Sequence, residues 1–95
     1  MKIKVKFFAT FREVFSGEVK EIELDNRSNV QDLLNLLCDS PQRSQEIFDD
    51  SGNIKRYVRV LKNGRRVQFL DGLRTELGEG DVVAMFPPGY PGYDK

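Results

Sequence analysis

The sequence predicts an α+β fold in which one mixed β-sheet packs against one main crossover helix. Three observations lead to this prediction: an N-terminal segment that alternates lysine with apolar residues, a leucine-rich segment with helical spacing, and a continuously apolar segment near the C-terminal end. The chain has 95 residues, and a chain of this length buries one modest core. A single folded domain is therefore expected.

Two strands are predicted at the N-terminal end. In residues 1–8 the apolar side chains fall on one face at period two, and three lysines fall on the other face. In residues 19–24, Glu21 and Glu23 share one face. We expect these strands to pair antiparallel, with lysines opposite glutamates on the solvent-exposed side. The connection between them is expected to turn at Gly17.

An amphipathic helix is predicted to follow and to pack on the sheet. Its apolar residues recur at positions i, i+3, i+4 and i+7, namely Val30, Leu33, Leu34 and Leu37. Ser28 or Asn29 is expected to cap the start of this helix. A second helix is predicted to begin at Ser40 and Pro41, with serine as the cap and proline in the first turn, and to extend toward Phe48.

The C-terminal half predicts three more strands and one helical turn. Residues 57–62 have the pattern of a strand, and the pair Asn63-Gly64 is typical of a type I′ hairpin turn. Residues 66–70 are expected to return as the partner strand, and the leucine spacing in residues 73–77 indicates a helical turn. Residues 82–86 are apolar without alternation, which is typical of a strand covered on both faces.

This order of elements corresponds to the β-grasp, or ubiquitin-like, plan. In that plan the last strand lies parallel to the first in the middle of the sheet, after a right-handed crossover through the helix. We assign residues 1–88 to the β-grasp domain and residues 89–95 to an extended, flexible C-terminal tail. Three of the four prolines lie in residues 87–95, so this segment is expected to leave the body of the domain as an extended arm.

Composition excludes several classes of function. Lys and Arg total 15 and Asp and Glu total 15, so the basic excess typical of a nucleic-acid binder is missing. The chain has no histidine, which excludes a histidine base or a histidine metal site within it. Cys38 is the single cysteine, so neither an internal disulfide nor a cysteine metal cluster can form, and a reducing cytoplasm is the expected location. No apolar run is long enough to span a membrane.

Two segments resemble the small subunit of molybdopterin synthase, the MoaD family. The segment Ile3–Ala9, followed by Arg12-Glu13, is similar to the opening of that family. The segment Leu77–Pro88, with a turn ending in Gly-Asp, an apolar strand and then Phe-Pro-Pro, is similar to its closing signature. The sulfur carrier of thiamine biosynthesis, ThiS, is a more distant relative. The resemblance spans nearly the whole chain.

The resemblance implies chemistry at the C-terminal end of the chain and no active site of its own. In the family, the chain ends in Gly-Gly, and an E1-like partner enzyme adenylates the terminal carboxylate with ATP. Sulfur then replaces AMP to give a thiocarboxylate. The tail next enters the large subunit of the synthase and donates sulfur for the molybdenum or tungsten cofactor. By this resemblance Gly92 is the carrier residue, residues 86–91 are the threading arm, and no cofactor is bound by the chain itself.

The chain departs from the family at its end. Pro91 stands where the first glycine of the pair is expected, and Tyr93-Asp94-Lys95 follow Gly92. A peptide-bonded Gly92 has no free carboxylate, so the carrier function requires a protease that trims the chain after Gly92. Two alternatives stay open: a non-catalytic β-grasp module that binds a protein partner, and a ubiquitin-like modifier or a sulfur carrier for another pathway such as thiamine synthesis.

Candidate partner-binding residues lie beside the arm. Phe8 falls on the lysine face of the first strand, where an aromatic side chain favours either docking or packing under a loop. The predicted docking set is Phe8, Phe86, Pro87, Pro88, Gly89, Tyr90 and Pro91.

Two further features have a functional and a structural interpretation. Four arginines surround the predicted hairpin, and they indicate either a patch for an acidic partner or a solvated rim: Arg56, Arg59, Arg65 and Arg66. Cys38 lies on the apolar stripe of the helix, so an inert buried thiol is favoured over a sulfur relay.

Overall fold

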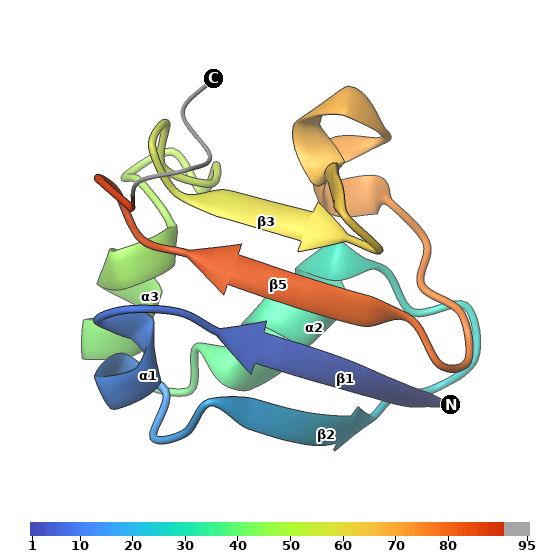
Figure 1. Cartoon of the computed structure of the whole chain (residues 1–95). Coiled ribbons are helices and arrows are strands. Elements are labelled where there is room, and N and C mark those ends of the chain that lie inside the picture. Colours follow the sequence, from blue (N-terminus) through green and yellow to red (C-terminus); the bar gives the residue numbers. More distant parts are fainter. Residues whose placement is uncertain (91–95) are drawn as a thin grey trace.

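The computed structural model describes residues 1–90, which form one mixed sheet and three short helices (Figure 1). The strands are β1 (Lys2–Phe7), β2 (Val19–Glu23), β3 (Arg59–Lys62), β4 (Arg65–Arg66) and β5 (Val82–Phe86). The helices are α1 (Phe11–Val14), α2 (Val30–Leu37) and α3 (Pro41–Ile47), and two 3₁₀ turns are η1 (Val67–Phe69) and η2 (Gly72–Arg74). The strand order is β2-β1-β5-β3-β4, with β5 central and parallel to β1, which confirms the predicted β-grasp fold.

The pairing of β1 with β2 follows from their charge patterns. The strands are antiparallel, and Lys2 lies opposite Glu23 while Lys4 lies opposite Glu21. The side chains of β1 alternate between exposed lysines and buried apolar residues over its whole length. The expected arrangement, with opposite charges facing each other on the exposed side of the sheet, is confirmed.

The prediction that β5 is covered on both faces is wrong. Val83 and Met85 are fully buried, whereas Val82 and Ala84 on the other face are only half-buried. The reason is that α2 lies across one face of the sheet and no second layer covers the other face in residues 1–90 (Figure 1). The continuous apolar run therefore reflects a central position between two strands and not two covering layers.

Helices α2 and α3 begin at the residues that the sequence indicates. Asn29 caps α2 and forms a reciprocal capping box with Asp32, with both hydrogen bonds at 2.9 Å. Ser40 caps α3 by accepting a hydrogen bond from the Arg43 N–H at 3.2 Å. The four apolar residues of the α2 stripe are all buried.

The connection between β1 and β2 contains a short helix that the sequence pattern does not predict. Helix α1 places Phe11 and Phe15 in the core, where Phe15 stacks on Phe7 with ring centroids 4.9 Å apart. Phe11 meets Phe15 edge-on at 5.7 Å. One helical turn is too short to show periodicity, so burial of these rings determines the conformation.

The β3–β4 hairpin turns as predicted, but its return strand is much shorter than expected. Asn63 and Gly64 both have positive φ, 49° and 85°, as a type I′ turn requires. The prediction of a strand over residues 66–70 is wrong, because β4 ends at Arg66 and η1 follows. In a strand Val67 and Phe69 would share one face; the 3₁₀ turn instead buries Val67 completely and leaves Phe69 exposed.

The predicted helical turn over residues 73–77 is shifted and shorter. It is η2, which ends at Arg74. Leu77 lies beyond it in an extended segment, and its N–H donates to the Ser28 carbonyl at 2.9 Å. A second hydrogen bond, from the Val30 N–H to the Thr75 carbonyl at 2.9 Å, joins the same segment to the start of α2. The two bonds hold this segment beside the helix.

Asp81 joins the start of β5 to the hairpin. Its carboxylate accepts hydrogen bonds from the Gly78 N–H at 2.7 Å and from the Asn63 amide at 3.0 Å, and Lys62 Nζ lies 3.6 Å away. Burial alone raises the pKa of this carboxyl, but the hydrogen bonds from Asn63 and Gly78 and the charge of Lys62 outweigh burial and lower the pKa below its usual value. The Gly-Asp pair before the last strand thus has a structural role.

No helix within residues 1–90 combines the length and the apolar character needed to cross a membrane.

Candidate functional site at the start of the C-terminal arm

Three aromatic side chains form a cluster at the end of the sheet from which the arm begins. We call Phe8, Phe86 and Tyr90 the aromatic platform. Phe8 and Phe86 stack with centroids 4.4 Å apart and planes inclined by 13°. Tyr90 lies 5.1 Å from Phe86 and 5.9 Å from Phe8. Residues from both ends of the described chain therefore meet at one place.

Strand pairing explains why Phe8 and Phe86 meet. Phe7 is the partner of Met85 in the parallel β1–β5 ladder, so the next residues along each strand are also neighbours. The Phe8 N–H donates to the Met85 carbonyl at 3.2 Å, which extends the ladder by one bond. The half-buried Phe8 ring packs on Phe86, and its docking to a partner stays a prediction.

The first part of the arm is folded back, so the prediction that it runs extended from Pro87 is wrong for residues 87–90. The Tyr90 N–H donates to the Pro87 carbonyl at 3.4 Å. Gly89 has a φ of +80°, a backbone conformation that a residue with a side chain adopts only with strain. This turn returns Tyr90 to the aromatic platform. The tilted ring contact between Tyr90 and Phe86, with planes inclined by 46°, is one tertiary contact that favours the turn.

Arg59 anchors the arm from the neighbouring strand. It is the register partner of Phe86, and its Nη2 donates to the Tyr90 carbonyl at 2.8 Å. Arg59 is only 4% exposed, so it does not belong to a solvated rim or to an exposed arginine patch. A buried guanidinium needs hydrogen-bond acceptors, and the Tyr90 carbonyl is one of them.

Sequence reasoning missed this role. Arg59 lies between Val58 and Val60, so the alternation of a strand places it on the face opposite the buried one, where a charged side chain is ordinary. Its burial and its partner could not be read from the sequence, because Tyr90 is 31 residues away along the chain.

The predicted docking residues differ in their exposure. Phe86 is only 2% exposed and Pro87 is buried, so neither presents a surface of its own. Pro88 and Gly89 are exposed at the tip of the turn. Pro91 and Gly92, the predicted end of the arm and the predicted carrier residue, lie outside the described residues.

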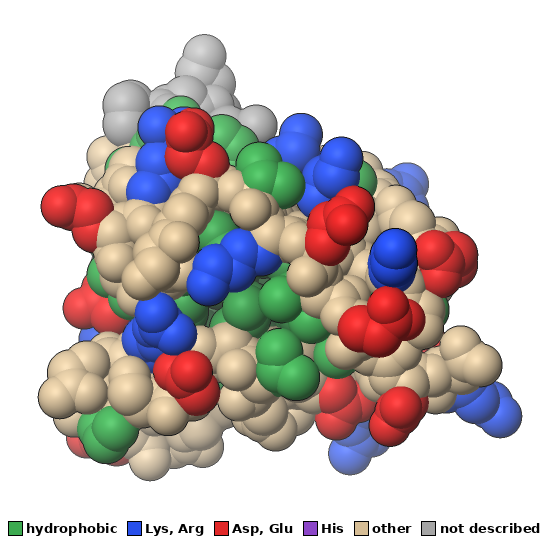
Figure 2. Space-filling model, turned by 90° about the horizontal axis from the view of Figure 1, so that it is seen from below, with side chains coloured by type: hydrophobic (Ala, Val, Ile, Leu, Met, Phe, Trp, Pro, Cys, Tyr) green, Lys and Arg blue, Asp and Glu red, His purple; other side chains and the backbone are tan. Residues whose placement is uncertain are grey.

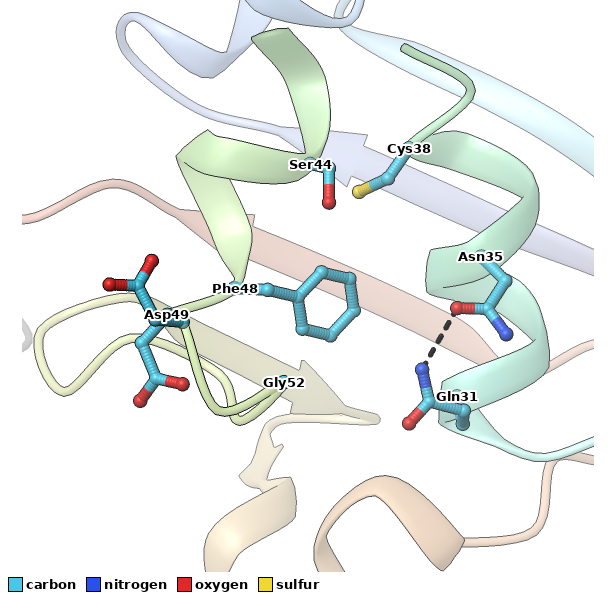
Figure 3. Close-up of a pocket in the computed structure, with 8 residues that line it drawn as sticks. Gln31, Asn35, Cys38, Ser44, Phe48, Asp49 and Gly52 are labelled. Atoms are coloured by element: carbon cyan, nitrogen blue, oxygen red, sulfur yellow. Dashed lines mark hydrogen bonds between the residues drawn. The ribbon is translucent and has the colours of Figure 1, made fainter. Parts of the chain in front are cut away.

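A separate hollow contains Cys38 (Figure 3). It has a volume of about 310 Å³ and lies between α2, α3 and the turn that follows α3. The Cys38 thiol and the Ser44 hydroxyl point into it above the ring of Phe48. Burial, with a smaller contribution from Asp39, raises the pKa of Cys38 to about 11, so the thiol is protonated and unreactive at neutral pH. The prediction of an inert thiol agrees with this environment, although Cys38 is half-buried and not fully enclosed.

The described residues contain no metal-binding cluster of acidic or cysteine side chains. Residues 1–90 contain no group of three or more Cys, Asp or Glu side chains placed to hold a metal ion. On the face shown in Figure 2, positive and negative side chains are interspersed around hydrophobic ones, so this face has no continuous basic surface of the kind that attracts nucleic acid. What the arrangement can do is hold and present the start of the arm.

The chain is similar in sequence and in fold to several known proteins. The family model described as ThiS family matches residues 5–92. Small archaeal modifier protein 3 of Haloferax volcanii is 40% identical over 89 residues, which cover 93% of this chain and 96% of that protein. The solution structure of the Haloferax volcanii HVO 2177 protein superposes with a TM-score of 0.82 at 40% identity, covering 97% of this chain and 87% of that one. A Pyrococcus furiosus protein described as a molybdopterin converting factor, subunit 1, superposes with a TM-score of 0.70 at 33% identity, covering 93% and 98%.

Proposed function

The chain belongs to the ThiS family, and from this membership we propose that it is a sulfur carrier that works through its C-terminal end. It is a ubiquitin-like protein of the small modifier and sulfur-carrier group. In the proposed reaction Gly92 becomes the last residue and carries sulfur as a thiocarboxylate. The protein is then a co-substrate and subunit of a sulfur-transfer complex, and the catalytic residues belong to its partners.

The proposed sequence begins with trimming. A protease hydrolyses the peptide bond after Gly92 and releases the segment that begins at Tyr93, which leaves a carboxylate on Gly92. In an E1-like partner, a carboxylate oxygen bonds to the α-phosphorus of ATP and pyrophosphate leaves. A hydrosulfide equivalent then attacks the acyl carbon, AMP leaves, and the chain ends in a thiocarboxylate.

The observation that best supports this proposal is the anchored start of the arm. The hydrogen bond from Arg59 Nη2 to the Tyr90 carbonyl, with a donor–acceptor distance of 2.8 Å, holds the backbone at a point two residues before Gly92. The chain is therefore held against the sheet at Tyr90, and only a short segment beyond this residue has to enter a partner's cleft. Limiting the ordered length in this way reduces the entropy lost when the end of the chain is bound.

For the sulfur acceptor, we propose a large subunit of the molybdopterin synthase type, in synthesis of the molybdenum or tungsten cofactor. The Phe86-Pro87-Pro88 sequence and the similarity to the Pyrococcus furiosus protein support this choice. A sulfur carrier for thiamine synthesis would use the same fold and the same end. ATP is consumed by the activating partner and is not held by this chain.

A second candidate function is protein modification. The relative that is 40% identical is named a small archaeal modifier protein, and this observation favours a role in which Gly92 is joined to lysines of other proteins. A third possibility, a binding module that never carries sulfur, is favoured by residues 93–95, which cap Gly92. All three functions use the arm, but they differ in the chemical state of Gly92.

Intact mass spectrometry of the protein from its native cells, without a C-terminal tag, tests the proposal. We expect a species that ends at Gly92, part of it heavier by the exchange of one oxygen for sulfur. A matched Gly92→Ala variant is expected to lose the sulfur-containing species. High-mass conjugates that disappear in the same variant would support the modifier function instead.

A single species that ends at Lys95, in cells that are making the cofactor, would contradict both carrier and modifier. The binding-module function would then be the one supported.

A further inference from the structure

A second surface lies beside the β3–β4 hairpin, away from the aromatic platform. We call it the Phe69 groove. It is a hollow of about 450 Å³ lined by Gly64, Arg65, Arg66, Phe69 and Leu70. The hairpin pairs with the start of β5, since Lys62 lies opposite Val83, whereas the arm follows the end of β5. The groove and the arm are therefore at opposite ends of the central strand.

Phe69 is the most exposed large apolar side chain in the described part of the protein. Its exposed fraction is 78%, although Val67, in the same 3₁₀ turn η1, is completely buried. The guanidinium of Arg66 lies 5.6 Å from the centre of the Phe69 ring and holds it by a cation–π contact. The fold thus keeps an aromatic ring in a defined, solvent-facing position without using it in the core.

The charges around the ring have one sign. Arg65 is exposed and Arg66 is half-buried. Neither forms an ion pair with any of residues 1–90, and the Nε of Arg66 is buried without a hydrogen-bond partner among those residues. No acidic side chain lines the groove. In a chain of zero formal net charge, this corner offers two unneutralised guanidinium groups beside an apolar surface.

We propose that the Phe69 groove docks an acidic segment of a partner protein. An apolar side chain of that segment would cover Phe69, and neighbouring carboxylates would pair with Arg65 and Arg66, whose planar guanidinium groups suit bidentate contacts. Since the groove lies away from the arm, a partner can hold the protein here while the arm is used elsewhere. The inference does not depend on sulfur chemistry at Gly92.

A single-stranded nucleic acid could also stack a base on Phe69, but the observations favour a peptide. Binding of a strand requires a basic track along several phosphates. The groove offers only two arginines, next to the hairpin turn at Gly64, and the chain as a whole has no excess of basic residues. A short acidic segment with one apolar residue matches this size and charge.

Two-dimensional amide NMR of the full chain tests the proposal. The probe is a blocked peptide of sequence Asp-Glu-Leu-Asp-Glu, compared with Asn-Gln-Leu-Asn-Gln and with a short oligouridylate. We expect the acidic peptide to shift the amides of residues 64–70 and the neutral peptide to bind at least fivefold more weakly. Phe69→Ser and Arg65→Glu are each expected to weaken binding at least fivefold.

Tyr57 and Arg56 provide a matched control. Tyr57 is 63% exposed and lies under Arg56, with the guanidinium 5.4 Å from the ring centre, at the other end of β3. Tyr57→Ser is expected to change the affinity for the peptide less than twofold. Both aromatic residues are exposed, so each variant should keep the amide dispersion of the folded protein.

Three results would overturn the proposal. One is the absence of shifts at residues 64–70 at millimolar acidic peptide. Another is an equal change of affinity in Phe69→Ser and Tyr57→Ser, which would show that the peptide has no preference for the Phe69 groove. The third is tighter binding of the oligouridylate to the same residues, which would identify a nucleic-acid surface.

Discussion

At the scale of single residues, Arg59 shows how one buried charge can organise a chain terminus. Its side chain reaches across from β3 and donates to the carbonyl of Tyr90, while the Tyr90 ring also contacts the Phe86 ring at a tilt. A hydrogen bond from a charged donor contributes about 1.5–3 kcal/mol. The combination of this bond with the aromatic contacts of Tyr90 explains why the proline- and glycine-rich segment begins as a turn and not as an extended arm.

Replacing Arg59 tests this role. In Arg59→Met we expect the Tyr90 amide to exchange with solvent about tenfold faster or more, because a loss of about 1.4 kcal/mol corresponds to a factor of ten. Hydrogen exchange followed by NMR gives the rate. Arg65→Met, which changes an exposed arginine away from the arm, is the control and should leave the exchange of Tyr90 unchanged. Equal exchange rates in both variants would show that Arg59 does not hold the arm.

Asp81 provides a prediction about pH, also at the residue scale. Its pKa is lowered in the folded protein, so the carboxylate stabilises the fold at pH values above its unfolded pKa, and this contribution is lost as the pH falls through the lower, folded pKa. We expect Asp81→Asn to be less stable than the parent protein at pH 7, with the difference shrinking as the pH falls below 4.

Urea unfolding at several pH values measures the Asp81 effect. Asp50→Asn is a suitable control, because Asp50 is exposed in the turn after α3. A difference between Asp81→Asn and the parent that grows in acid would contradict the assignment.

At the scale of elements, α2 joins local sequence signals to the core. Its apolar stripe was evident from spacing and is present in the structure, which also shows that Asn29, one of the two cap candidates, forms a capping box with Asp32. Leu34 is fully buried, so Leu34→Ala is expected to lower the free energy of unfolding by about 2–5 kcal/mol. Leu36 on the same helix is 52% exposed, and Leu36→Ala should change the free energy of unfolding by about 0.5 kcal/mol or less.

Chemical denaturation of the two leucine variants gives a direct comparison. A similar loss of unfolding free energy in Leu34→Ala and Leu36→Ala would mean that Leu34 does not face the sheet as described.

The elements that could not be predicted are the shortest ones. Helix α1 and the turns η1 and η2 span one turn each, which is too short for a periodic pattern. Their conformations follow from which side chains the core accepts: Phe11 and Val67 are fully buried. A strand over residues 66–70 was a reasonable expectation from the hairpin signal, but it would have placed Val67 and Phe69 in the same environment.

At the scale of the whole molecule, the core is complete before the arm begins. The buried hydrophobic residues of the described chain run from Ile3 to Phe86. We therefore expect a chain that ends at Tyr90 to have a free energy of unfolding within about 0.5 kcal/mol of the full-length protein. Thermal and urea unfolding of the two chains measure this difference. A large loss of stability would mean that residues 91–95 contribute to the fold.

The candidate site could be predicted in part. Phe8 stood out as an aromatic residue on the lysine face of β1, and the Phe-Pro-Pro sequence marked the start of the arm. The folding back of Tyr90 and the burial of Phe86 could not be predicted, because both depend on contacts between segments far apart in sequence. The carrier role of Gly92 stays a prediction that the intact-mass experiment tests.

The sequence by itself determined the fold class, the charge-matched pairing of β1 with β2, where α2 and α3 start, and the type I′ turn at Asn63-Gly64. Each of these depends on residues close in sequence or on a repeating pattern, so local physical chemistry is sufficient. Only the tertiary structure decided the burial of Arg59 against the Tyr90 carbonyl, the aromatic platform and the exposure of Phe69. These features arise where strands from different parts of the chain meet, and burial there depends on neighbours that no local pattern specifies.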